Sequence, residues 1–500
     1  MSGLSDRAAA AVPEYDLMMS DAASALRNAV ADLERRAREL DPDAERLEEW
    51  SRAVTAHVLE AASVRGGEPA YTAETGSDDT SPGELGVDVA AALAALGSVE
   101  RSGINQTSGR HLAFIPGGGL FPAALGDLLA DAANPYAGIR FAAPAAAALE
   151  QSLLRWMADL VGYPQTAGGD LTSGASVATL EAILTAREAA TITAADVHRT
   201  VVYLTEQTHH CVEKGLRIAG LGECIVRRVT LDERLRMEPA ALETAVRSDR
   251  ESGLNPWLVV ATAGTINVGS VDPLATIADV ADAYGLWLHV DAAYGGFFLL
   301  TTHGRDMLVG IDRSQTTALD PHKGLFLPFG SGALIVRDVR QLAEAHRYSA
   351  TYLSDARAGT EGLSASDVSI ELSRPFRGLR LWLPLKLFGV AAFRAALEEK
   401  LLLARYFHRR LSAVPRWEVG PDPDLSVVTY RYLPTNGDAN DFNRRLLDAV
   451  LASGRAAISA TELNGNYTLR LAVLHYRTHL DDVDELIELL VTEAERLETT

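Results

Sequence analysis

One lysine and one aspartate of this 500-residue chain stand where chemistry could take place. Lys323 lies in the stretch LDPHKGLFLPFGSGALIVRD, between a polar tripeptide and a long apolar run that is typical of a buried strand. Asp291 ends the apolar run of LHVDAAYGG, 32 residues earlier. Each residue alone is most simply structural, because lysines reach toward solvent and aspartates cap helices or form salt bridges. As a pair they allow a more specific chemistry.

A lysine at the edge of a core can act as a nucleophile. Burial disfavours the ammonium form, so it lowers the pKa of the lysine and leaves an amine that forms a Schiff base with an aldehyde. A buried Asp291 can hold a protonated ring nitrogen, and the small Ala292 and Ala293 leave room for a flat ring. An imine-forming lysine and an acid for a pyridinium nitrogen are what pyridoxal 5'-phosphate (PLP) requires of an enzyme.

The phosphate of such a cofactor also needs a binding site. The stretch LTSGASVATLEAILTAR places Ser173, Gly174, Ala175 and Ser176 directly before a predicted helix. Backbone N–H groups at a helix N-terminus, together with small hydroxyl residues, favour an anion. Ser and Gly also begin ordinary helices, and no Gly-Lys-Ser/Thr follows, so this is not a Walker A loop. The segment indicates a phosphate-binding site only in combination with the lysine and the aspartate.

Two histidines form a fourth candidate feature. His209 and His210 in EQTHHCVEKGLRIAG follow the predicted strand VVYLT and open a helix. One histidine could stack on an aromatic cofactor, whereas two neighbouring histidines could bind a metal ion. The sequence has no HExxH motif, no CxxC motif and no nearby carboxylate at ligand spacing. We therefore expect no metal site.

The elements that must position these residues alternate between strands and helices. Apolar, β-rich runs begin at Val201, Glu223, Trp257, Leu286 and Gly332, and helical segments such as EPAALETAVRSDRES and DPLATIADVADAYG separate them. This alternation predicts an α/β fold whose mostly parallel sheet is covered on both faces and binds ligands at the carboxyl ends of its strands. We expect a helical arm over residues 1–107, the large α/β domain over 108–385 and a small α+β domain over 386–500.

Composition excludes several classes of function. The net charge of −21 argues against binding to nucleic acid or to an anionic membrane surface. The two cysteines, Cys211 and Cys224, cannot form a disulfide framework and lack metal-site spacing. The N-terminal stretch has no continuous apolar region of the signal-peptide kind, and no run approaches a membrane span. These features predict a cytoplasmic protein.

The quoted motifs resemble a known family. HVDAAYGG, the 32-residue gap and DPHKG are similar to the group II PLP-dependent amino-acid decarboxylases, which include aromatic-L-amino-acid and glutamate decarboxylases. The resemblance runs from roughly residue 110 to 382. It implies fold type I of the PLP enzymes, a homodimer with active sites at the subunit interface, and conversion of an L-amino acid to an amine and CO2.

The resemblance also implies roles for single residues. Lys323 would carry the cofactor as an aldimine, Asp291 would bind the pyridine nitrogen, and His209 would stack on the ring and take part in protonation. Other positions that match the family's motifs would bind the cofactor: Gly174, Ala175, Ser176, Thr265, Ala293 and His322. The residues that match the family's substrate pocket are Phe114, Ile115 and Pro116.

One departure from the family concerns protonation after CO2 loss. Aromatic decarboxylases carry a tyrosine for this step on a loop after the lysine strand, but the corresponding stretch GTEGLSASDVSIEL has none, and Tyr352 comes about a dozen residues too early. Relatives with a changed loop residue instead oxidise the intermediate with O2 to an aldehyde and ammonia, so this reaction stays an alternative. His209 could supply the proton instead.

Other reactions and the substrate stay open at this point. Transamination and carbon–carbon lyase chemistry use the same cofactor contacts. A non-catalytic PLP-binding regulator would need a basic DNA-binding segment, and the arm shows none. Acidic, aromatic and aliphatic amino acids are all possible substrates, with Arg377 and Arg380 as candidates for binding a side-chain carboxylate.

Overall fold

The computed structural model describes residues 12–64, 67–73, 84–96, 100, 102–347 and 362–499, with side chains from residue 23 onward. Two compact units divide the chain. One comprises Met1–Val64 and Gly76–Glu100, and the other comprises Arg65–Thr75 and Arg101–Thr500. Tyr352 lies outside the described residues. The domain boundaries expected from the sequence stay a prediction.

The first unit is helical, as the sequence predicts. It contains α1 (Val12–Ala37), the 3₁₀ turn η1 (Arg38–Leu40), α2 (Ala44–Val64) and α3 (Val89–Ala95). The side chain of Asp88 caps α3 by accepting a hydrogen bond from the N–H of Ala91. No residue of α2 or α3 is buried. These helices therefore expose their apolar side chains within the described chain.

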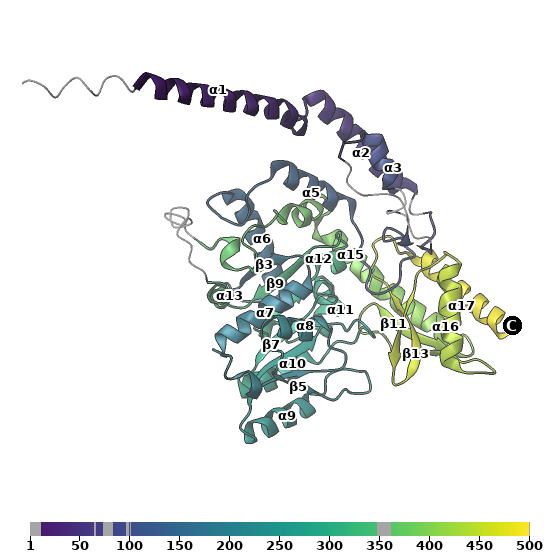
Figure 1. Ribbon diagram of the computed structural model, residues 1–500. Helices are drawn as coiled ribbons and strands as arrows, with labels where there is room; N and C mark the ends of the chain where they lie inside the picture. The colour runs from purple at the N-terminus through teal and green to yellow at the C-terminus, as the bar shows by residue number, and fades with distance from the viewer. Residues whose placement is uncertain are drawn as a thin grey trace, which may run out of the picture. The chain divides into compact units, whose positions relative to one another are not determined.

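A seven-stranded sheet forms the centre of the second unit (Figure 1). Six of its strands run in one direction, and β9 is antiparallel to both of its neighbours. The expected mostly parallel α/β sheet is confirmed. In spatial order the strands are β3 (Gly168–Thr172), β9 (Gly332–Val336), β8 (Thr316–Leu319), β7 (Trp287–Asp291), β6 (Asn255–Thr262), β4 (Thr200–Leu204) and β5 (Ile225–Arg228).

Helices cover both faces of this sheet. Alternate residues of β4 point to opposite cores: Val202 packs with the side of α7 (Ala175–Ala189) and α8 (Cys211–Ile218), and Tyr203 packs with the opposite side. The opposite side is covered by α6 (Pro144–Val161), α9 (Pro239–Glu251) and α10 (Leu274–Tyr284). Strands buried on both faces explain the continuous apolar runs in the sequence.

The C-terminal part contains a second, antiparallel sheet of four strands in the order β10 (Trp417–Val419), β11 (Val427–Tyr432), β13 (Asn466–Ala472) and β12 (Ser459–Leu463). Three helices accompany it, namely α15 (Gly378–Ser412), α16 (Ala439–Ala452) and α17 (Leu480–Glu498). Gly389 interrupts α15 with φ of 70° and ψ of 157°. This arrangement confirms the small α+β part expected from the sequence.

Two strands of the large sheet were not predicted. β3 has the sequence GGDLT, in which two glycines and an aspartate give little β-propensity. β8 has only four residues, TTAL. Both become strands because neighbouring strands supply hydrogen bonds and burial, which a single segment does not reveal. They carry the chain into the two loops that build the site.

Candidate active site

A cavity of about 320 Å³ opens at the carboxyl ends of the central strands. Asp291 is the last residue of β7, and the chain after β8 enters α12 (Pro321–Gly324), which holds Lys323. Ten residues expected at the site line this cavity together: Ile115, Ser173, Gly174, Ala175, Ser176, His209, Asp291, Ala293, His322 and Lys323.

Lys323 forms an ion pair at the floor of the cavity. Its Nζ lies 2.9 Å from Oδ2 of Asp320, and 23% of its side chain is exposed. Burial lowers the pKa of the Lys323 ammonium, but the charge and hydrogen bond of Asp320, joined by the charge of Asp291, outweigh it and raise the pKa above its usual value. The lowered pKa expected from burial alone is therefore wrong for this chain.

Asp291 is buried, with 7% of the residue exposed. Its Oδ1 accepts a hydrogen bond from the N–H of Ala293 at 3.1 Å, which fixes the carboxylate beside the small side chain of that residue. The backbone of Asp291 pairs with Thr262 of β6 and Ala318 of β8. An acid held this way in a dry site can stabilise a protonated ring nitrogen.

The predicted phosphate cradle lies where β3 turns into α7. The hydroxyl of Thr172 donates to the carbonyl of Gly174 and accepts from its N–H, which shapes the turn. The N–H of Ala175, the first residue of α7, donates to Oδ1 of Asp320 at 2.7 Å. A Cβ atom on Gly332 would lie 2.4 Å from Cα of Gly174. Glycine at 332 therefore lets β9 approach the cradle closely.

Two histidines border the same cavity. Nδ1 of His209 accepts from the N–H of Cys211 at 3.3 Å, and its ring centroid lies 4.1 Å from that of His210. Nδ1 of His322 lies 2.6 Å from the carbonyl oxygen of Ser331, to which it donates. Burial is the main cause that lowers the pKa of both His209 and His322. Both rings are therefore suited to be neutral at neutral pH.

Three expected residues do not line the cavity. Thr265 is buried and accepts a hydrogen bond from the N–H of Ser270, so it holds a turn beside the site. Phe114 is 58% exposed and has a positive φ of 54°. Pro116 is buried, but the cavity is bordered by its neighbour Ile115.

The two arginine candidates are engaged elsewhere. Arg377 pairs with Glu371 at 2.6 Å, and Arg380 pairs with Asp127 at 2.8 Å. Neither arginine lines the cavity, and each has a carboxylate partner. Their proposed role in binding a substrate carboxylate has no support in this geometry.

Sequence reasoning missed several residues of the site. Asp320 was overlooked, although it contacts both the lysine and the cradle. Its place three residues before Lys323 in the quoted DPHK motif was the signal that could have suggested a role. The other missed residues that line the cavity include Gln207, Cys211, Ile266, Tyr294 and Phe329. They come from separate segments of the chain, and no spacing rule connects them.

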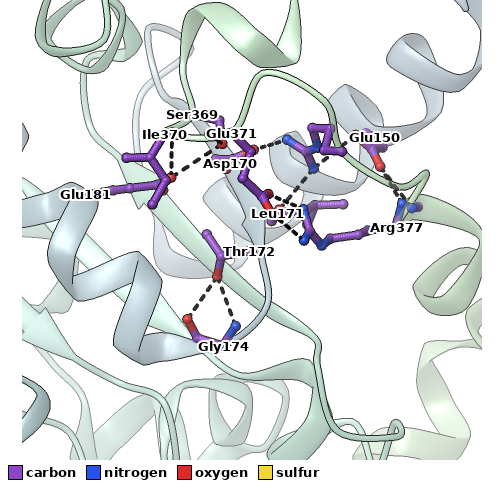
Figure 2. A network of polar contacts seen from close by, with 12 residues as sticks. Glu150, Asp170, Leu171, Thr172, Gly174, Glu181, Ser369, Ile370, Glu371 and Arg377 are labelled. Carbon is purple, nitrogen blue, oxygen red and sulfur yellow. Dashed lines mark hydrogen bonds and ion pairs between the residues drawn. The ribbon is translucent and has the colours of Figure 1, made fainter. Parts of the chain in front are cut away.

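A buried charged network flanks the strand and the helix on either side of the cradle (Figure 2). The side chain of Arg374 is 1% exposed and pairs with Asp170 of β3 and with Glu150 of α6. It also donates to the carbonyl of Leu171 at 2.9 Å. Glu181 of α7 belongs to the same network. These contacts connect the segment after residue 362 to the elements that form the cradle.

The network contains more acid than base. Burial and then the charge of Asp170 raise the pKa of Glu181, and burial raises the pKa of Asp170 despite the opposing charge of Arg374. Oδ2 of Asp170 and Oε2 of Glu181 are buried and have no hydrogen-bond partner within the described chain. A proton shared between these carboxyl groups would satisfy both atoms.

The cavity fits PLP by the chemistry of its donor groups. Lys323 can bind an aldehyde, Asp291 can bind a ring nitrogen, and the start of α7 can bind a phosphate. No cluster of three or more metal-ligating side chains occurs in the described part of the chain. Within the same residues, no helix is both long and apolar enough to span a bilayer.

Comparisons with known proteins agree with this geometry. The family model of the pyridoxal-dependent decarboxylase conserved domain matches residues 101–433. The aromatic-L-amino-acid decarboxylase of Bacillus atrophaeus is 35% identical over 381 residues, which are 75% of this chain and 79% of that protein. Phenylacetaldehyde synthase of Arabidopsis thaliana is 31% identical over 368 residues, which are 71% of this chain and 75% of that protein.

A solved structure supports the same assignment. Oryza sativa TDC with PLP and tryptamine superposes with a TM-score of 0.86 at 26% identity and covers 91% of this chain and 99% of its own. The sequence resemblance and the expected cofactor are thus confirmed. The chain belongs to the pyridoxal-dependent decarboxylase family, as an enzyme that uses PLP to remove the carboxyl group of an amino acid.

Proposed function

We propose that this enzyme decarboxylates an aromatic L-amino acid to the corresponding amine and CO2. The observation that carries the proposal is the lining of the cavity. Lys323 is the one lysine or arginine among the described residues that line it, so an acidic substrate side chain has no cationic partner there. Ile115, Ile266 and Phe329 supply apolar surface, which suits an aromatic ring. The aromatic-L-amino-acid decarboxylase relative supports the same choice.

The residues of the cavity have separate roles in this proposal. Lys323 would hold the cofactor through its aldehyde and would release the amine at the end of turnover. Asp291 would keep the pyridine nitrogen protonated, and PLP held there would supply a sink for the electrons of the bond to the carboxyl group. His209 and Ala293 would contact the two faces of the ring, and His209 could return a proton to the substrate. The cofactor's surroundings are completed by Gly174, Ala175, Ser176, Thr265 and His322.

A second candidate is decarboxylation coupled to oxidative deamination. The stretch GTEGLSASDVSIEL, residues 359–372, contains no tyrosine. Tyr294 lines the cavity, but its hydroxyl is buried and hydrogen-bonded to Ser426 at 2.8 Å. The relative that is named a phenylacetaldehyde synthase makes this alternative concrete. Without a proton donor, the substrate carbon that has lost CO2 would be open to reaction with O2.

Product analysis tests both candidates. Purified enzyme with PLP would be given aromatic, acidic and aliphatic L-amino acids, with products followed by mass spectrometry and oxygen by an electrode. Amine from aromatic substrates without oxygen uptake would support the proposal. Aldehyde and ammonia with oxygen uptake would support the second candidate. Turnover of glutamate in preference to aromatic substrates would contradict the proposed substrate class.

We also propose that the enzyme acts as a cytoplasmic homodimer whose active sites lie at the subunit interface. Residues 1–107 would form an arm that packs on the partner, residues 108–385 the cofactor domain and 386–500 the small domain. Support comes from exposed apolar side chains at helical spacing in α1, namely Leu26, Val30 and Leu33. Sedimentation of the full chain measures the mass of the particle in solution, and twice the mass of one chain would support the dimer. Val30→Glu places a charge on the apolar face of α1 and should weaken the dimer. Asn28→Glu, on the opposite face of α1, is its control.

A further inference from the structure

Asp320 connects the two halves of the cofactor site. Its Oδ1 accepts the N–H of Ala175 at 2.7 Å, and its Oδ2 lies 2.9 Å from Nζ of Lys323. Only 3% of its side chain is exposed. One buried carboxylate therefore occupies the first N–H group of the cradle and neutralises the charge of the lysine.

These contacts oppose cofactor binding in two ways. A carboxylate beside the N–H of Ala175 repels a phosphate group that approaches the same helix end. The carboxylate also stabilises the ammonium form of Lys323, whose pKa is raised, and an ammonium group cannot attack an aldehyde. Both obstacles disappear if a single proton moves from the lysine to the aspartate.

We propose that Asp320 takes a proton from Lys323 when PLP enters and then, as a neutral carboxylic acid, donates a hydrogen bond to the phosphate. This inference rests on the proposed placement of the phosphate at the start of α7. One Nζ–H bond breaks and one O–H bond forms on the Asp320 carboxylate, so the ammonium and the carboxylate become a neutral amine and a neutral acid. No other reactant is needed.

The surroundings favour this direction once an anion is present. A phosphate beside Asp320 penalises a second negative charge, which makes the carboxylate a better proton acceptor. Burial lowers the pKa of both His209 and His322, which makes each a weaker proton acceptor than an ordinary histidine. Nε2 of His322 lies 3.6 Å from Oδ2 of Asp320, farther than the lysine Nζ. The titratable and charged groups that act on this pair are His209, Cys211, Asp291, His322 and, through His322, Arg380.

Infrared difference spectra between cofactor-free and PLP-loaded enzyme test the inference directly. Wild type should gain the carbonyl stretch of one protonated carboxylic acid, and Asp320→Asn should not. The carbonyl oxygen of asparagine can still accept the N–H of Ala175, so the fold should survive. Asp338→Asn is the matched control, because Asp338 also caps a helix, α13 (Val339–Ala345), away from the cavity. The control should keep the new band.

Counting protons by calorimetry in buffers of different ionisation enthalpy gives an independent reading. At a pH where Lys323 is protonated in both proteins, Asp320→Asn should release about one more proton to solvent per PLP bound than wild type. Equal counts, or a carboxylic-acid band that persists in Asp320→Asn, would overturn the inference. Failure of a folded Asp320→Asn variant to load PLP would do so too. If wild type itself shows no Lys323-dependent visible absorbance with PLP, the proposed cofactor site fails instead.

Discussion

We expect cofactor attachment to depend on Lys323. Replacing it with alanine should abolish the visible absorbance that PLP acquires on binding and should abolish amine formation, because no other lysine lines the cavity among the described residues. Lys323→Arg keeps a positive charge beside Asp320 but cannot condense with an aldehyde, so it controls for loss of the ion pair. Absorbance that persists in both variants would contradict the assignment.

Asp291 should matter for rate more than for cofactor retention. Asp291→Asn preserves the size of the side chain and its contact with the N–H of Ala293, but it removes the charge that we propose keeps the ring nitrogen protonated. We expect kcat to fall by roughly a hundredfold or more while PLP still binds. Steady-state kinetics with PLP content measured on the same samples check this. A near-normal kcat would show that another group serves the nitrogen.

The motifs around single residues gave part of the site. Lys323 and Asp291 could be predicted because each borders an apolar run, Lys323 before one and Asp291 at the end of one, and the resemblance assigned their roles. The protonation state of Lys323 could not be predicted, because it depends on Asp320. The side chain of Asp320 is held by the N–H of Ala175 in α7, which lies 145 residues earlier in the sequence. Phe114 and Pro116 were expected in the pocket, but only their neighbour Ile115 lines the cavity. The sequence of this segment alone does not reveal which of its side chains points inward.

The packing of β9 against the cradle leads to a prediction about elements. In Gly332→Ala the new Cβ would meet backbone atoms of Gly174 at 2.4–2.7 Å, so the start of α7 must move. We expect the affinity for PLP to fall by at least about tenfold, since a displaced helix end holds a phosphate less well. Spectroscopic titration with PLP measures this. Gly222→Ala is the control, because its nearest contact would be 3.6 Å from the side chain of Arg217.

The charged network between α6, β3 and α7 predicts a pH-dependent stability. The pKa of Glu181 is raised by burial and by Asp170, whereas the unfolded chain ionises this residue at its ordinary pKa. The folded state therefore retains a proton that the unfolded state has lost, and stability falls as pH rises above about 4.5. Glu181→Gln cannot ionise, so its stability relative to wild type should increase from pH 5 to pH 8 by at least about 1 kcal/mol.

Urea unfolding at the two pH values would measure this difference. Glu188→Gln, on the exposed side of the same helix, should show no such change. An equal response of both variants would mean that Asp170 and Glu181 do not share a proton. The acidic positions in this network were invisible to sequence reasoning, because Asp170 lies in a strand that the pattern did not predict and Arg374 pairs with it from 204 residues away.

For the whole molecule, the alternation of apolar strands and helices was enough to predict the α/β layout and the smaller C-terminal part. It could not give strand order or the reversed β9, because these depend on contacts between distant segments. The same limit applies to buried polar residues. His111, His289 and His475 lie in unrelated segments, yet each is at most 2% exposed. Together they should control the behaviour of the fold in acid.

Burial lowers the pKa of His111 and His289 to about 4 and that of His475 to about 3. Unfolded histidines gain protons near pH 6.5, so the unfolded state binds more protons below that value, and stability is lost as pH falls from 6.5 toward 4. Each histidine should cost about 1.4 kcal/mol by pH 5.5. The buried carboxyl groups act in the opposite direction, so a variant is needed to isolate the effect.

His111 offers that variant, since neither ring nitrogen has a hydrogen-bond partner in the described structure. His111→Leu removes the titration without removing a polar contact, and leucine has a similar volume. Between pH 7 and pH 5.5 it should lose about 1.2 kcal/mol less stability than wild type in chemical unfolding. His198→Gln, an exposed position, should follow wild type. Parallel pH profiles for His111→Leu and wild type would show that acid sensitivity arises elsewhere in the fold.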